Sequence, residues 1–160
     1  MKHTKGCQNV VNRFRNINGK KGDLYDGFGV GMVDKDKVEL DYLKECDTVF
    51  VHENLILWKY PERPHYIIQL NPPLEHWVIQ ILGESGININ ECGYSNDFKK
   101  LKKEIKGDID NETDEKLGLL VNRIINSNHA VVEKLKTILL YLKDKNLESN
   151  PEELKQKLLN

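Results

Sequence analysis

The hydrophobic period of this chain changes near Gly83, and this change restricts the possible folds more than any other feature. Before Gly83, short runs rich in β-branched and aromatic residues are separated by glycine and proline turns, which is typical of strands. After Gly83, apolar residues recur with the spacing of a helix face. We therefore predict an α/β fold, with a small sheet in the N-terminal half and helices in the C-terminal half.

The predicted elements follow from the same patterns. In the first half we expect helices over 7–14 and 37–46, strands over 28–33, 48–51, 55–58 and 66–70, and a helix beginning near Pro72. Two later helices are indicated by apolar stripes, one of Leu117, Leu120, Val121, Ile124 and Ile125, the other of Val131, Val132, Leu135, Ile138, Leu139 and Leu142. Asn150, Pro151 and Glu153 predict the start of a terminal helix.

Length and charge limit the class of protein. The 160 residues fit a single domain, which we divide into an α/β part over 1–84 and a helical extension over 85–160. The 24 basic and 25 acidic side chains give no net field that would attract nucleic acid or a membrane. Three widely spaced cysteines favour a reduced, cytoplasmic setting. No apolar run is long enough to span a bilayer, so we expect no membrane association.

Two carboxylates end the first predicted strand. The run Phe28–Val33 is followed by Asp34, Lys35 and Asp36, so the pair Asp34 and Asp36 is expected at the rim of the sheet. Two carboxylates that converge on one ion, with water and phosphate as further ligands, suit magnesium. The alternative is structural: Asp34 ends the strand and Asp36 caps the following helix.

Glu75 is the third candidate for this site. It follows the strand over 66–70 and the break Asn71-Pro72-Pro73, and therefore comes from the same kind of sheet edge. Two strand ends that each supply a carboxylate favour a metal site more than either does alone. The alternative is that Glu75 stabilises the first turn of its helix through the backbone dipole.

Two further patterns have a functional and a structural interpretation. Gly27, Gly29 and Gly31 resemble a dinucleotide loop only superficially, and we expect the missing side chains to let a helix approach the sheet closely.

Basic residues cluster twice, and either cluster could contact phosphates or form a solvated surface. The clusters are Lys99, Lys100, Lys102, Lys103 and Lys106, and Lys2, Lys5, Arg13, Arg15, Lys20 and Lys21.

These residues resemble the Toprim domain, in particular the compact OLD-type and RloB-type versions. The resemblance rests on the strand Gly29–Val33 with Asp34 and Asp36, and on the later segment Asn71-Pro-Pro-Leu-Glu75-His-Trp77. It covers roughly residues 1–85. The resemblance implies magnesium- or manganese-dependent cleavage, transfer or synthesis of phosphodiesters. It further implies that Asp34 and Asp36 are metal ligands and that Glu75 is a third acid.

The chain departs from this family at its start. Toprim domains carry a glutamate at the end of a first strand, whereas no acidic residue precedes Asp23 here. We therefore expect a domain that either lacks this strand or begins downstream of it. Lys5 lies where the loop after that strand belongs, and it is a candidate phosphate contact.

Three hypotheses for the function follow, the last of which is a nucleotide or other phosphate binder without turnover. The first is a Toprim-like, magnesium-dependent phosphodiester-cleaving protein that acts on DNA or RNA in nucleic-acid metabolism or in defence against mobile DNA. The second is a non-catalytic interaction protein with a degenerate Toprim-like fold, whose C-terminal helices bind a partner or a second copy. The two acidic strand ends favour the enzyme, and the missing first-strand glutamate favours the interaction protein.

Overall fold

The computed structural model describes residues 6–35, 40–106 and 111–160. The chain divides into two compact units, which we call the sheet unit, Met1–Pro73 with Lys134–Asn160, and the helix unit, Leu74–Glu133. Both the predicted α/β class and the predicted helical second half are confirmed. The predicted extension over 85–160 contributes to both units, because its residues from Lys134 onward belong with the sheet.

The elements of the described chain are as follows. The first half contains α1 (Cys7–Asn12), β1 (Asn16–Ile17), β2 (Lys20–Lys21), β3 (Gly29–Asp34), α2 (Asp41–Lys44), β4 (Asp47–His52), β5 (Leu55–Lys59) and β6 (His65–Leu70). The second half contains α3 (Leu74–Glu84), the 3₁₀ turn η1 (Ile89–Cys92), α4 (Phe98–Lys106), α5 (Asn111–Ile125), α6 (Ala130–Lys145), the 3₁₀ turn η2 (Asn146–Glu148) and α7 (Pro151–Leu159).

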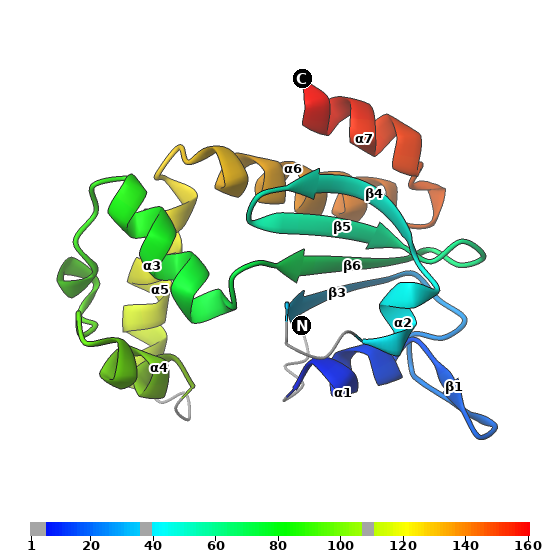
Figure 1. Ribbon diagram of the computed structural model, residues 1–160, viewed down its shortest axis with the longest axis horizontal. Helices are drawn as coiled ribbons and strands as arrows, with labels where there is room; N and C mark the ends of the chain where they lie inside the picture. Colours follow the sequence, from blue (N-terminus) through cyan, green and yellow to red (C-terminus); the bar gives the residue numbers. More distant parts are fainter. Residues whose placement is uncertain (1–5, 36–39, 107–110) are drawn as a thin grey trace. The chain divides into compact units, whose positions relative to one another are not determined.

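The main sheet combines one parallel pair with an antiparallel meander. Its strand order is β3-β6-β5-β4 within the described residues. β6 runs parallel to β3 and antiparallel to β5, and β5 runs antiparallel to β4. In Figure 1 the arrows of β3 and β6 accordingly point the same way. The two strands therefore end at the same edge of the sheet.

β6 forms the centre of the sheet unit, and all six of its residues are buried. On one face, Ile67 belongs to a core cluster with Val11 and Phe14 of the α1 region. The other face is covered by the C-terminal segment of the same unit. There Tyr66 of β6 donates a hydrogen bond to the Ser149 carbonyl (3.5 Å), and α7 contacts β4. Burial on both faces explains why β6 has apolar side chains at consecutive positions, such as Ile67 and Ile68.

Glycines in β3 allow α1 and the residues after it to approach the sheet closely, as predicted. A Cβ atom at Gly31 would lie 2.9 Å from Val10 Cγ1 and 2.9 Å from Ile67 Cδ1. One at Gly29 would meet the ring of Phe14. At Gly27 nothing lies within 4 Å, so this close packing involves Gly29 and Gly31 only.

The helix unit is built on α3. Trp77, Val78, Ile81 and Leu82 form its buried face, and α3 contacts both α4 and α5. At its C-terminal end, Glu84 accepts a hydrogen bond from His129 (2.6 Å). The other ring nitrogen of His129 accepts the Val131 N–H (3.3 Å), so this side chain also caps the start of α6.

Local structure differs from the sequence prediction in two places. The helix expected over 37–46 is a single turn, Asp41–Lys44, among the described residues, and 36–39 lie outside them. Between α1 and β3, where the sequence predicts no strand, the chain forms the short antiparallel pair β1 and β2, in which Ile17 opposes Lys20. Two-residue strands carry too little apolar pattern to be recognised in a sequence.

Candidate functional site at the ends of β3 and β6

Asp34 is the last residue of β3, as predicted. The parallel register pairs it with Leu70, the last residue of β6, and the next amide, Lys35 N–H, donates to the Leu70 carbonyl (2.8 Å). The side chain of Asp34 is half-buried, and its own carbonyl accepts a weak hydrogen bond from the Cys7 thiol (3.8 Å). The strand end that carries Asp34 is therefore fixed both by β6 and by the start of α1.

The chain leaves β6 through a proline turn. The Asn71 amide donates to the Asn54 carbonyl (3.1 Å), and the Asn71–Pro72 peptide bond is cis. This turn begins beside the end of β3, because Leu70 and Asp34 occupy the same register position. The carboxyl ends of two parallel strands thus carry the two segments that the sequence singled out. In open α/β sheets this edge is where ligands bind.

Glu75 lies in the first turn of α3 and is only 3% exposed. A carboxylate at a helix N-terminus is stabilised by the backbone dipole, so the structural interpretation of Glu75 holds at this position. Burial distinguishes Glu75 from an ordinary first-turn glutamate, however. Withdrawing a carboxylate from water is costly unless hydrogen bonds, a cation or a metal compensates.

The structure does not test the predicted three-acid group. Asp34 belongs to the sheet unit and Glu75 to the helix unit, whereas Asp36 and Lys5 lie outside the described residues. Within 6–35, 40–106 and 111–160, no three or more histidine, cysteine, aspartate or glutamate side chains are grouped so that they could hold a metal ion. The expected magnesium site thus remains a prediction.

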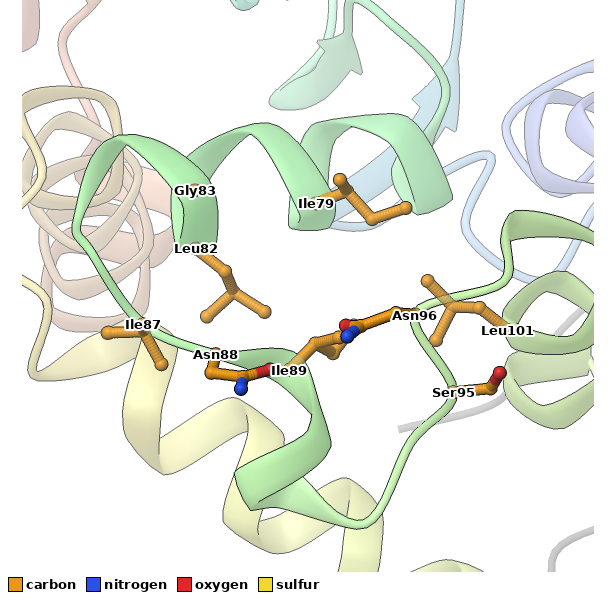
Figure 2. A pocket seen from close by; sticks show the side chains of 9 residues that line it. All are labelled: Ile79, Leu82, Gly83, Ile87, Asn88, Ile89, Ser95, Asn96 and Leu101. Carbon is orange, nitrogen blue, oxygen red and sulfur yellow. The ribbon is translucent and has the colours of Figure 1, made fainter.

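Figure 2 shows a surface pocket of about 260 Å³ in the helix unit. Its walls are mainly aliphatic, with three polar side chains, and it is lined by Ile79, Leu82, Gly83, Ile87, Asn88, Ile89, Ser95, Asn96 and Leu101. Asn88 is already engaged, because its side chain accepts the Asn90 N–H (3.1 Å). None of these lining side chains titrates near neutral pH, so the pocket offers no acid or base of its own.

A buried histidine in the sheet unit escaped the sequence analysis. His65, at the start of β6, is 1% exposed, and its Nδ1 forms a 2.8 Å hydrogen bond with the Tyr42 hydroxyl. Burial lowers the pKa of His65, and the backbone carbonyls of Leu24 and Gly27 partly oppose this shift. Burial also raises the pKa of Tyr42. Both groups are therefore held neutral within an aromatic cluster, which is typical of a structural role.

The two basic clusters differ in their surroundings. In the first part of the chain, Arg13 pairs with Asp23 (2.7 Å), Arg15 with Glu45 (3.4 Å) and Lys21 with Asp26 (2.7 Å). These three cations are thus neutralised locally, as the structural interpretation of that cluster requires. The lysines of the other cluster lie on α4. No ion pair joins Lys99, Lys100, Lys102 or Lys103 to a described carboxylate.

No family model, curated protein or solved structure matches this chain. Within the described residues, no helix is both long and apolar enough to cross a membrane.

Proposed function

We propose that this chain is a Toprim-like, magnesium- or manganese-dependent protein that cleaves phosphodiester bonds in nucleic acid. One observation carries the proposal: the parallel register of β3 and β6 pairs Asp34 with Leu70. The two acidic segments that resemble the Toprim pattern therefore leave the sheet at one edge. Asp34, Asp36 and Glu75 are the proposed metal ligands, and Lys5 is the proposed phosphate contact.

The donor set fits the metal in kind. Carboxylate oxygens are hard ligands of the type that magnesium prefers, and Glu75 is a carboxylate already withdrawn from water. When bound, the ion would stabilise phosphate charge and favour deprotonation of an attacking water. The chain itself holds Asp34 at a strand end that β6 fixes. The backbone at Asp34 is therefore already ordered before a metal ion binds.

Calorimetry tests the metal site directly. MgCl₂ or MnCl₂ is titrated into the wild-type protein, Asp34→Asn and Glu75→Gln. Asp47→Asn is the matched control, because Asp47 is an exposed aspartate at the opposite kind of strand end, the start of β4. We expect binding in the wild type and in the control, and its loss in the two site variants. No heat and no metal-dependent rise in the melting temperature of the wild type would overturn the proposal.

Cys7 supplies a second readout that does not depend on activity. Its thiol contacts the carbonyl of Asp34, so metal binding there should change the rate at which iodoacetamide alkylates Cys7. Turnover is then tested by nicking of supercoiled plasmid, with Asp36→Asn expected to abolish it. If the protein binds metal in both assays but leaves the plasmid intact, the proposed metal site stands and the proposed cleavage activity is wrong.

The second candidate function is a non-catalytic interaction protein. It is favoured by exposed leucines on the C-terminal segment, of which Leu140 is 63% and Leu147 is 68% exposed. Light scattering across a range of protein concentrations tests whether these leucines join two copies. Leu140→Glu should then convert a dimer into a monomer, and a wild type that stays monomeric throughout would contradict self-association.

A further inference from the structure

Four lysines of helix α4 lie on the outside of the helix unit. Leu101 is completely buried and faces inward, whereas Lys99, Lys100, Lys102 and Lys103 are all exposed. Lys99, Lys102 and Lys103 are three and four residues apart, a spacing that puts side chains next to one another on one helix face. The result is a dense positive strip on a chain whose overall charge is close to zero.

This strip forms no ion pairs in the part of the chain that the structure describes, although two carboxylates, Asp97 and Glu104, flank it in the sequence. No ion pair joins any of the four lysines to a described carboxylate, in contrast to Arg13, Arg15 and Lys21. The neighbouring acids have other partners. Asp97 accepts the Lys100 N–H (2.9 Å) as the helix cap, and Glu104 accepts the Ser95 N–H (3.0 Å).

The arrangement is unfavourable for the helix by itself. The first turn of α4 contains no acidic residue, and Lys99 and Lys100 follow its first residue, Phe98, near the positive end of the backbone dipole. Asp97 supplies a carboxylate there, as the cap. Like charges three and four residues apart also repel one another. An anion bound along this face would reduce the repulsion among the lysines.

An aromatic pair lies at the border of this strip. Phe98, the first residue of α4, packs its ring against that of His76 from α3, with the centroids 4.2 Å apart and the planes at 39°. Phe98 is partly exposed and His76 is exposed. Phe98 directly precedes Lys99 and is four residues before Lys102, so ring and cations share one end of the helix.

We propose that Lys99, Lys102 and Lys103, together with the His76–Phe98 ring pair, bind a single-stranded nucleic acid. The lysines contact backbone phosphates, and a base stacks on the exposed ring surface. A strip of cations beside aromatic side chains is the combination that single-strand binders use, because every base has a face that can stack. This binding needs neither metal nor cleavage and is therefore independent of Asp34 and Glu75.

Fluorescence anisotropy with a labelled oligothymidine in EDTA tests the proposal. We expect binding that weakens as salt rises. Replacing Lys99, Lys102 and Lys103 together by glutamine should weaken it at least tenfold and reduce the slope of log K against log salt by about 2, since each lost phosphate contact contributes about 0.7. The matched control replaces Lys20, Lys143 and Lys157, which are exposed elsewhere, and should change neither quantity appreciably.

The ring pair is tested with Phe98→Leu, which keeps an apolar side chain against α3, and with His76→Ala. Each should weaken oligothymidine binding about tenfold. Melting temperatures of all variants show whether the fold is retained, and EDTA removes any metal that Asp34 could hold. A failure of metal binding at Asp34 would therefore not affect this result.

Four results would overturn the proposal. They are no oligothymidine binding in EDTA, an equal loss in the control triple variant, duplex DNA bound as tightly as the single strand, and binding of phosphatidylserine vesicles through the same lysines without binding of the oligonucleotide.

Discussion

Gly29 and Phe14 are packed so closely that a Cβ atom on the glycine would lie 2.4 Å from Cε1 of the phenylalanine ring. Real Cβ contacts are never this short, and Phe14 is itself 2% exposed and enclosed by the core cluster. The missing side chain of Gly29 is therefore a requirement of the packing between the α1 region and β3, the strand that carries Asp34.

We expect Gly29→Ala to lower the free energy of unfolding by about 1–3 kcal/mol, the usual cost of inserting a methyl group into a filled core. Urea denaturation measures this change. Gly27→Ala is the matched control, because nothing lies within 4 Å of its Cβ position, and it should be close to neutral. Equal destabilisation by both variants would show that backbone flexibility, and not contact with Phe14, explains the glycines.

A second prediction concerns the pH dependence of stability. Burial lowers the pKa of His65 in the folded protein, whereas the unfolded chain protonates this ring near its ordinary value of about 6.5. The unfolded state therefore binds more protons just below that pH. Stability should be fully present above about pH 6.5 and should fall with decreasing pH until the lowered folded pKa is passed, at no more than about 1.4 kcal/mol per pH unit.

Urea denaturation at pH 7.5 and pH 5.5 measures the His65 contribution as a difference. His65→Gln should lose less stability between the two values than the wild type does. His76→Gln replaces an exposed histidine and serves as the control. Its difference in stability between the two pH values should equal that of the wild type. If His65→Gln retains the full wild-type difference, other groups cause the pH dependence.

The three cysteines should differ in reactivity. Burial is the main cause that raises the pKa of Cys46 to about 12, and Cys92 is completely buried with its pKa also raised. Because the thiolate is the reactive form, Cys7, which is partly exposed, should be alkylated first in the native protein. Mass spectrometry after brief iodoacetamide treatment shows the order in which the three cysteines are alkylated. Unfolding in urea should make their alkylation rates similar. Native labelling of Cys46 as fast as Cys7 would contradict the prediction.

Strong local patterns predicted most elements of the fold. The apolar runs located β3 to β6, and the helix predicted to begin near Pro72 is α3. The parallel pairing of β3 with β6 could not be predicted, because it joins residues far apart in the sequence, such as Gly29 and His65. The stripe on α5 was also only partly informative, since Val121 and Ile125 remain exposed while Leu120 is buried.

For the candidate site, the sequence correctly located Asp34 at a strand end and Glu75 in a first helical turn. It could not predict that Glu75 would be buried, because burial depends on how α3 packs in three dimensions. Nor could it find the Tyr42–His65 hydrogen bond, which joins residues 23 positions apart. Spacing rules detect neighbours on one element, and this pair joins two.

The start of α7 provides the last prediction. The side chain of Asn150 accepts hydrogen bonds from the Glu152 and Glu153 amides (2.9 and 3.2 Å), which confirms the predicted cap. Asn150→Ala removes both bonds and should lower the free energy of unfolding by about 1 kcal/mol. Asn150→Asp is the control, because its carboxylate can cap the same amides and should preserve stability. Thermal denaturation of the three proteins measures these differences, and an alanine variant as stable as the wild type would show that the contacts of α7 with the sheet unit hold the helix without its cap.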